Sequence, residues 1–240
     1  MSSSSIREFV DAAVDPHIRG FLHVAETPNG DALVLIHGAG GNAQAPLLRA
    51  LADSFANAGY TVLRCNLPYR QVRSFGPPGP GDAARDRAGL KNAITALKNN
   101  LGAPLLPDFG RSGDSSPDKP KEARIFLGGH SYGGRQSSML CAEEPDLVSA
   151  LVLLSYPLHP PRRPEQQRTQ HLPDLRTPTL FVHGTRDPFG SIQEIERAIK
   201  MIPAKTNLLA VEGAGHDLGF KGKREELPKQ IVAEFIALRS

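Results

Sequence analysis

The sequence Gly129-His-Ser-Tyr-Gly133 constrains the fold of this chain more than any other stretch. It directly follows the apolar run at residues 124–127, which indicates a strand that turns sharply into a helix with Ser131 at the bend. A serine at such a bend exposes its hydroxyl, and the strand and helix approach so closely that the flanking positions require glycine. The stretch is therefore typical of a nucleophile elbow.

The rest of the chain alternates apolar runs with helical stretches, which predicts a mostly parallel sheet with helices on both faces. We predict strands over residues 32–36, 61–65, 124–127, 150–154, 179–182 and 207–211, and an edge strand over 18–25. We predict helices over residues 46–58, 82–100, 131–143, 192–201 and 226–238. With 240 residues, 40% of them hydrophobic and 22% charged, the chain is long enough for a single α/β domain over residues 1–240.

Three longer connections interrupt this alternation. Residues 67–81 follow a strand and therefore leave from the edge of the sheet where ligands bind in open α/β folds. Residues 102–121 join a helix to the next strand, so we expect them at the opposite edge and without a catalytic part. Residues 156–178 lie where a lid would be inserted, but they are too few for a cap domain. We therefore expect a minimal lid and an open pocket.

Two residues that can cooperate with the serine follow later strands. Asp187 comes after the apolar run 179–182, and His216 comes after the run 207–211. A serine hydroxyl needs a base that takes its proton and a carboxylate that orients this base. We therefore predict Ser131 as the nucleophile, His216 as the base and Asp187 as the acid.

A glycine-rich loop, His37-Gly-Ala-Gly-Gly41, follows the strand at 32–36. Acyl transfer needs two backbone N–H groups that face the developing negative oxygen. The amide of Tyr132, directly after the serine, is expected to supply one. For the second we expect the amide of Ala39, with the amide of Gly40 as the alternative.

Other residues in the loops at this edge are candidates for contact with a substrate. They are Gly40, Tyr69, Arg70 and His159. Arginines also gather in these loops, namely Arg70, Arg73, Arg162 and Arg163. They either attract an anionic substrate or are ordinary solvated charges.

Composition restricts the partners. The net charge is +3 without a block of lysine and arginine, so we expect no nucleic acid partner. Metal-ligand spacing and a phosphate-binding Gly-x-x-x-x-Gly-Lys pattern are both lacking, so we expect no metal and no cofactor. No run approaches the ~18 apolar residues that span a bilayer, and residues 1–5 lack a basic leader. We expect a cytoplasmic protein without membrane contact, acting on a small ester.

Four segments together resemble the α/β-hydrolase superfamily over residues 31–238. They are the elbow, the loop at 37–41, Gly-Thr-Arg-Asp-Pro at 184–188 and Gly-Ala-Gly-His-Asp at 213–217. The segments at 128–135 and 154–161 are similar to a small cap-less group related to dienelactone hydrolases. That group includes the hydrolase-like domains of a testis-expressed protein and of a subunit of the non-specific-lethal histone acetyltransferase complex. Dienelactone hydrolase uses a cysteine where this chain has Ser131, so the resemblance does not imply its substrate.

The leading hypothesis is a serine esterase that cleaves small carboxylic esters or thioesters through an acyl-Ser131 intermediate. The resemblance to a complex subunit keeps open a non-catalytic interaction module. An intact triad argues against that module, because a scaffold has no physical need for a histidine and an acid at those strand ends. A peptidase or lyase that uses the same triad is a further alternative, because the fold and triad do not fix the chemistry.

Overall fold

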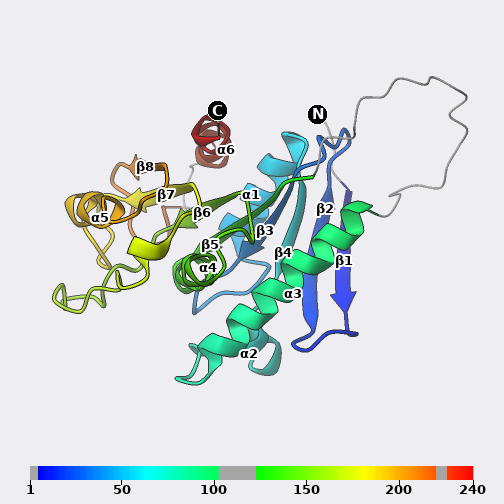
Figure 1. Cartoon of the computed structure of the whole chain (residues 1–240), viewed down its shortest axis with the longest axis horizontal. Coiled ribbons are helices and arrows are strands. Elements are labelled where there is room, and N and C mark those ends of the chain that lie inside the picture. The colour runs from blue at the N-terminus through cyan, green and yellow to red at the C-terminus, as the bar shows by residue number, and fades with distance from the viewer. Residues whose placement is uncertain (1–4, 103–122, 220–225, 240) are drawn as a thin grey trace, which may run out of the picture.

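The computed structural model describes residues 5–102, 123–219 and 226–239, and an eight-stranded sheet forms its centre (Figure 1). The strands are β1 (Ser5–Asp11), β2 (Ile18–Val24), β3 (Ala32–Ile36), β4 (Thr61–Cys65), β5 (Ile125–His130), β6 (Ala150–Leu154), β7 (Thr179–Gly184) and β8 (Thr206–Val211). Their order in the sheet is β1-β2-β4-β3-β5-β6-β7-β8. All pairs from β4 to β8 in this order are parallel, whereas β2 pairs antiparallel with both β1 and β4.

Helices cover both faces of this sheet (Figure 1). They are α1 (Pro46–Asn57), α2 (Pro68–Val72), α3 (Asp82–Gly102), α4 (Tyr132–Glu143), α5 (Ile192–Ile199) and α6 (Leu227–Leu238), with a 3₁₀ turn η1 (Leu172–Asp174). Helices α1 and α6 pack on one face, and α3, α4 and α5 pack on the other. This arrangement confirms the predicted α/β fold with two covered faces in a single domain.

The central strands are buried on both sides, which explains why they appear in the sequence as continuous apolar runs. In β3, Leu33 and Leu35 face the helices α1 and α6, whereas Val34 and Ile36 face the opposite core. Full burial of such a side chain stabilises the fold by about 1.5–3 kcal/mol. Both faces therefore favour apolar residues at every position of the strand.

Three elements were not predicted, and each has a physical reason. Strand β1 pairs on one side only and most of its residues are exposed, so it has no apolar run. It takes the edge of the sheet, and the predicted edge strand at 18–25 is instead the second strand. Helix α2 and turn η1 have five and three residues, too few to give a helical period.

The parallel topology brings several strand ends to one edge of the sheet. Strands β3, β5, β7 and β8 run in the same direction, so the loops that follow them emerge together. The predicted loop 102–121 lies outside the described residues, apart from Gly102 at the end of α3. None of the helices in the described ranges is both long and apolar enough to cross a membrane.

Candidate active site

Ser131 lies in the turn between β5 and α4 with a strained backbone. Its φ of 51° and ψ of −117° fall outside the regions that residues other than glycine usually adopt. A Cβ atom on Gly129 would lie 2.5 Å from the backbone nitrogen of Gly134, and one on Gly133 would lie 2.4 Å from the backbone oxygen of His37. These approaches confirm the predicted reason for both flanking glycines.

The structure brings Ser131, His216 and Asp187 into hydrogen-bond contact. The Oγ atom of Ser131 lies 2.8 Å from Nε2 of His216. The Nδ1 atom of His216 lies 2.8 and 3.0 Å from the two carboxylate oxygens of Asp187. Because an ionised carboxylate only accepts hydrogen bonds, Nδ1 carries the imidazole proton and Nε2 accepts from the serine hydroxyl. This is the geometry that base-assisted attack by a serine requires.

The loop after β7 holds the carboxylate of Asp187, whose side chain has no exposed surface. One of its oxygens also accepts a hydrogen bond of 2.9 Å from the backbone N–H of Phe189. The Nε2 atom of His183 donates to the carbonyl of Gly190 at 2.8 Å and fixes the same loop. Burial lowers the pKa of His183, so this ring stays neutral beside the acid.

Two rings flank the base. The ring of Phe189 lies against His216, with centroids 4.2 Å apart and an interplanar angle of 32°. The Nε2 atom of His130 donates to the backbone carbonyl of His216 at 2.8 Å. Neither contact is recognisable from the local sequence, because each joins loops that are far apart in the chain.

Residues 37–41 are called the glycine loop below, and two of their carbonyls face the same side chain. The carbonyl oxygens of Gly38 and Ala39 both lie within hydrogen-bond distance of the Tyr69 hydroxyl, at 3.3 and 2.8 Å. In a trans peptide the N–H group points opposite to the preceding C=O. The amides of Ala39 and Gly40 therefore both point away from Tyr69. Successive N–H groups with a shared direction form a concave site that attracts anions.

The amide of Tyr132 belongs to the first turn of α4. The first four N–H groups of a helix have no acceptor within the helix, so this amide is available beside the serine. The Tyr132 hydroxyl donates to a carboxylate oxygen of Asp86 at 2.8 Å. The geometry fits the predicted pair of oxyanion donors, and their role in catalysis stays a prediction.

A cavity of about 590 Å³ opens beside Ser131. The glycine loop, residues 45–48 at the start of α1, and Phe189 form much of its wall, together with His130, His216 and Asp217. Gly40, one of the predicted substrate contacts, lies in this wall. Most of the wall is apolar, and among the described residues that line it there is no lysine or arginine.

The structure places the other three predicted substrate contacts outside the described cavity wall, and their contact with a substrate stays a prediction. Tyr69 and Arg70 are buried and outside the cavity wall, because α2 turns their polar atoms onto backbone carbonyls of the glycine loop. His159 is also buried outside the wall. Its Nδ1 atom donates to the carbonyl of Pro160 at 2.8 Å, and its Nε2 atom lies 3.5 Å from a carboxylate oxygen of Glu194 on α5.

Arg73, Arg162 and Arg163 are not part of the described cavity wall either, and Arg73 pairs with Asp82. The expected attraction of an anionic substrate therefore finds no support at this cavity. Residues 156–178, the predicted minimal lid, contribute no residue to the cavity wall that the structure describes.

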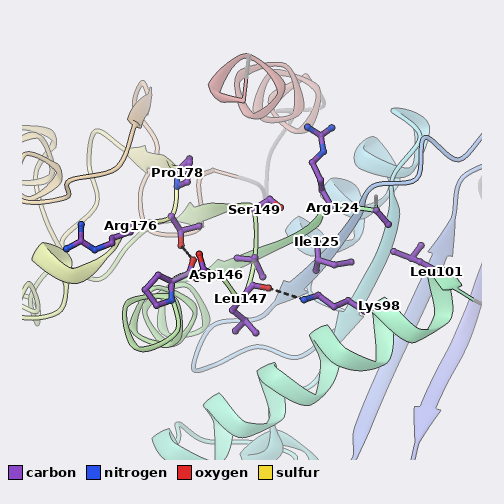
Figure 2. A pocket seen from close by; sticks show the side chains of 13 residues that line it. Lys98, Leu101, Arg124, Ile125, Asp146, Leu147, Ser149, Arg176 and Pro178 are labelled. Carbon is purple, nitrogen blue, oxygen red and sulfur yellow. Dashed lines mark hydrogen bonds between the residues drawn. The ribbon is translucent and has the colours of Figure 1, made fainter. Parts of the chain in front are cut away.

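A second cavity of about 740 Å³ lies at the opposite edge of the sheet (Figure 2). Its wall includes Lys98 of α3, Arg124 and Ile125 at the start of β5, and Pro178 before β7. It is larger than the cavity at Ser131, but it contains no member of the triad. Volume alone therefore does not identify the candidate site, and the position of the triad does.

Comparisons with known proteins agree with this architecture. A family described as alpha/beta hydrolase domain matches residues 29–239. The polyketide synthase ThaQ of Burkholderia thailandensis is 32% identical over 136 residues, which cover 50% of this chain and 6% of ThaQ. This chain therefore corresponds to only a small part of that curated relative.

Solved structures share the fold over nearly the whole chain. An alpha-beta serine hydrolase homologue from Coxiella burnetii is similar with a TM-score of 0.70 and 16% identity over 98% of each chain. A dienelactone hydrolase from Anabaena variabilis is similar with a TM-score of 0.68 and 19% identity over 98% of this chain and 95% of that one. The family match includes the elbow, the glycine loop and both triad partners, and it supports a hydrolase as the general class of activity. This chain belongs to the alpha/beta hydrolase family.

Proposed function

We propose that this chain is a serine hydrolase that cleaves small neutral carboxylic esters or thioesters through an acyl-Ser131 intermediate. One observation carries the proposal. The hydroxyl of Ser131, on a strained turn, lies 2.8 Å from the base nitrogen of His216, whose other nitrogen binds Asp187. This contact lies beside an apolar cavity whose wall includes the glycine loop, which supports acyl transfer rather than simple binding.

Acylation follows from the positions of these groups. The Nε2 atom of His216 takes the proton of Ser131 as Oγ attacks the carbonyl carbon of the ester. The negative oxygen that forms faces the amides of Ala39 and Tyr132, and such a donor lowers the barrier by ~3 kcal/mol. When the tetrahedral intermediate collapses, the alcohol or thiol leaves with the proton from His216.

Deacylation uses the same groups with water as the nucleophile. Water gives a proton to Nε2 of His216 and attacks the acyl carbon of the intermediate. Collapse releases the carboxylic acid and returns the proton to Ser131. Throughout both steps Asp187 keeps the proton of His216 on Nδ1 and stabilises the imidazolium that forms.

The cavity supports a small and neutral substrate. Its volume of about 590 Å³ lies within the range of ~300–1,000 Å³ that is usual for small-molecule sites. Ala45, Pro46, Leu47 and Leu48 give it an apolar wall. Each methylene group of an acyl or alcohol chain buried there contributes about 0.8 kcal/mol of binding energy.

Turnover of p-nitrophenyl butyrate tests this proposal. Ser131→Ala is expected to abolish turnover without unfolding the protein, because only one hydroxyl is removed. Ser138→Ala is the matched control, since it removes a buried hydroxyl from α4, the helix that follows Ser131. That hydroxyl contacts the carbonyl of Arg135 and the ring of His171 instead of the triad. The control is expected to keep wild-type activity. Equal turnover by Ser131→Ala and the wild type would reject the proposal.

A further inference from the structure

We propose that Tyr69 and Arg70 are positioning residues that hold the glycine loop in its catalytic orientation, and that the buried carboxylate of Asp86 joins them to the nucleophile elbow. These three residues are called the carbonyl clamp below. The inference rests on the proposed function, and it assigns roles to residues that do not touch the substrate cavity.

Arg70 binds carbonyl oxygens of the glycine loop. Its Nε atom donates to the carbonyl of Gly41 at 2.8 Å, and Nη2 donates to the carbonyl of Ala39 at 2.9 Å. The remaining contacts reach the chain that follows α2, with Nη2 donating to Gly76 at 2.8 Å and Nη1 to Arg73 at 3.1 Å. A planar guanidinium presents its donors in fixed directions, so it sets the orientation of all four carbonyls at once.

Tyr69 adds a second donor to the same peptide. Its hydroxyl lies 2.8 Å from the carbonyl oxygen of Ala39, which therefore has two donors on one side. The ring of Tyr69 also meets the ring of Tyr132 edge to face, with centroids 6.0 Å apart. Tyr69 thus packs directly against Tyr132, whose amide is the other predicted oxyanion donor.

Asp86, a residue of α3, connects Tyr69 of α2 with Tyr132 of α4. One carboxylate oxygen accepts from the backbone N–H of Tyr69 at 3.1 Å, and the other accepts from the hydroxyl of Tyr132 at 2.8 Å. The side chain is fully buried. The carboxylate of Asp86 therefore connects the backbone of Tyr69 with the side chain of Tyr132 at the start of α4.

The consequence concerns the two peptides on either side of Ala39, whose N–H groups belong to Ala39 and Gly40. The Tyr69 hydroxyl lies within hydrogen-bond distance of the carbonyl oxygens of both peptides, at 3.3 and 2.8 Å. If either peptide rotated, its carbonyl oxygen would face the cavity and its N–H group would turn away from it. The oxygen would then repel the negative charge of the tetrahedral intermediate, where an N–H group stabilises it. Glycine at position 40 opposes such a rotation only weakly, because it tolerates both signs of φ. The clamp supplies the missing restraint.

This role predicts a specific kinetic signature. The oxyanion forms only in the transition state, so loss of the clamp lowers kcat while KM for the ground-state ester changes little. A residue that only stabilises the fold would lower the melting temperature without this selective loss.

Tyr69→Phe tests the inference with Tyr156→Phe as its matched control. Both tyrosines are buried, and each donates from its hydroxyl to a backbone carbonyl, at 2.8 Å to Ala39 and at 2.7 Å to Arg168. We expect the two variants to lose similar thermal stability. Only Tyr69→Phe is expected to lower kcat, by about tenfold, because it alone frees the glycine loop.

Arg70→Met and a tetrahedral adduct provide the second measurement. We expect this variant to lower kcat by about a hundredfold and to weaken binding of a butyl boronic acid by a similar factor. The boronate binds Ser131 as a tetrahedral anion, so its affinity reports on the oxyanion donors, while KM does not. If Arg70→Met fails to fold, Tyr69→Phe still decides the question.

The outcomes separate this inference from the proposed function. If Tyr69→Phe keeps the kcat of Tyr156→Phe, or if only its KM changes, the clamp is overturned. In that case an active wild type and an inactive Ser131→Ala would leave the esterase proposal intact. If the wild type neither turns over esters nor binds the boronate, the proposed function itself fails.

Discussion

His130 donates a hydrogen bond from Nε2 to the backbone carbonyl of His216 at a distance of 2.8 Å. Burial lowers the pKa of His130, so the ring is neutral at pH 7 and its single N–H group is used in this contact. The residue directly before the nucleophile therefore fixes the loop that carries the base. The ring centroids of His130 and His216 lie 5.3 Å apart. The elbow therefore positions both the nucleophile and the base.

The contact between His130 and His216 predicts different results for two substitutions. His130→Gln keeps an N–H donor near the position of Nε2, so we expect kcat close to that of the wild type. His130→Leu removes the donor and is expected to lower kcat about fivefold, which corresponds to about 1 kcal/mol for a lost hydrogen bond. Steady-state kinetics on p-nitrophenyl butyrate measures both. Equal losses for Gln and Leu would show that the hydrogen bond is not what matters.

Asp187→Asn is expected to lower kcat about a thousandfold or more and to leave KM nearly unchanged, because it disturbs the tautomer of the base and not the binding of substrate. Asp146→Asn, at the opposite edge of the sheet, is the matched control and is expected to be silent. Initial rates over a range of ester concentrations separate the two constants. A silent Asp187→Asn would place the acid elsewhere.

Stability is expected to fall as the pH drops from about 6.5 to about 4. Burial lowers the pKa of His23, His37 and His171 from 6.5 to about 4 in each case. Within this window the unfolded chain binds protons that the folded chain does not, so the stability present above pH 6.5 is lost on acidification. Urea unfolding at pH 7, 6 and 5 measures the effect.

His171→Gln provides the internal control for this pH dependence. Its ring binds the hydroxyl of Ser138 and lies outside the cavity wall, so the variant is not expected to disturb the triad. The slope of the unfolding free energy against pH reports how many protons the chain takes up on unfolding. Removing this histidine should reduce that number by about one. An unchanged slope in the variant, or equal wild-type stability at pH 7 and 5, would contradict the assignment.

A neutral ester is expected to react faster than the same ester with a free carboxylate on its acyl chain. The described cavity wall offers apolar residues and Asp217, which would repel an anion. A carboxylate substrate that reacts faster at low salt only would instead point to an electrostatic contribution from the arginines.

Esters with short acyl chains are expected to exceed palmitoyl esters in kcat/KM, because the cavity of about 590 Å³ lacks room for a long chain.

Much of the fold follows from the sequence, because buried parallel strands leave a strong pattern. The runs at 32–36 and 150–154 have two buried faces, and the structure places strands β3 and β6 over the same residues. Strand β1 escaped prediction because its charged, mostly exposed residues pair on one side only. An edge strand of this kind does not differ from a polar loop in its composition.

The triad was predictable because chain order and strand ends bring its members to one edge, and the structure places all three in contact. The contacts of the residues around the triad were not predictable from the sequence. The side chains of Tyr69 and Arg70 belong to α2, whose five residues show no periodicity that reveals their direction. Asp86 lies within an ordinary helix, and only the packing of α3 shows that its carboxylate reaches both Tyr69 and Tyr132.

Covalent modification of Ser131 is detected most directly by peptide mass spectrometry after treatment with a fluorophosphonate. This reagent reacts with a serine that a neighbouring base activates. We expect one adduct per chain, located on the peptide that contains Ser131 and absent in Ser131→Ala. We also expect Ser138→Ala to be labelled like the wild type. No adduct on this peptide, or an adduct that persists in Ser131→Ala, would contradict the role of Ser131 as the nucleophile.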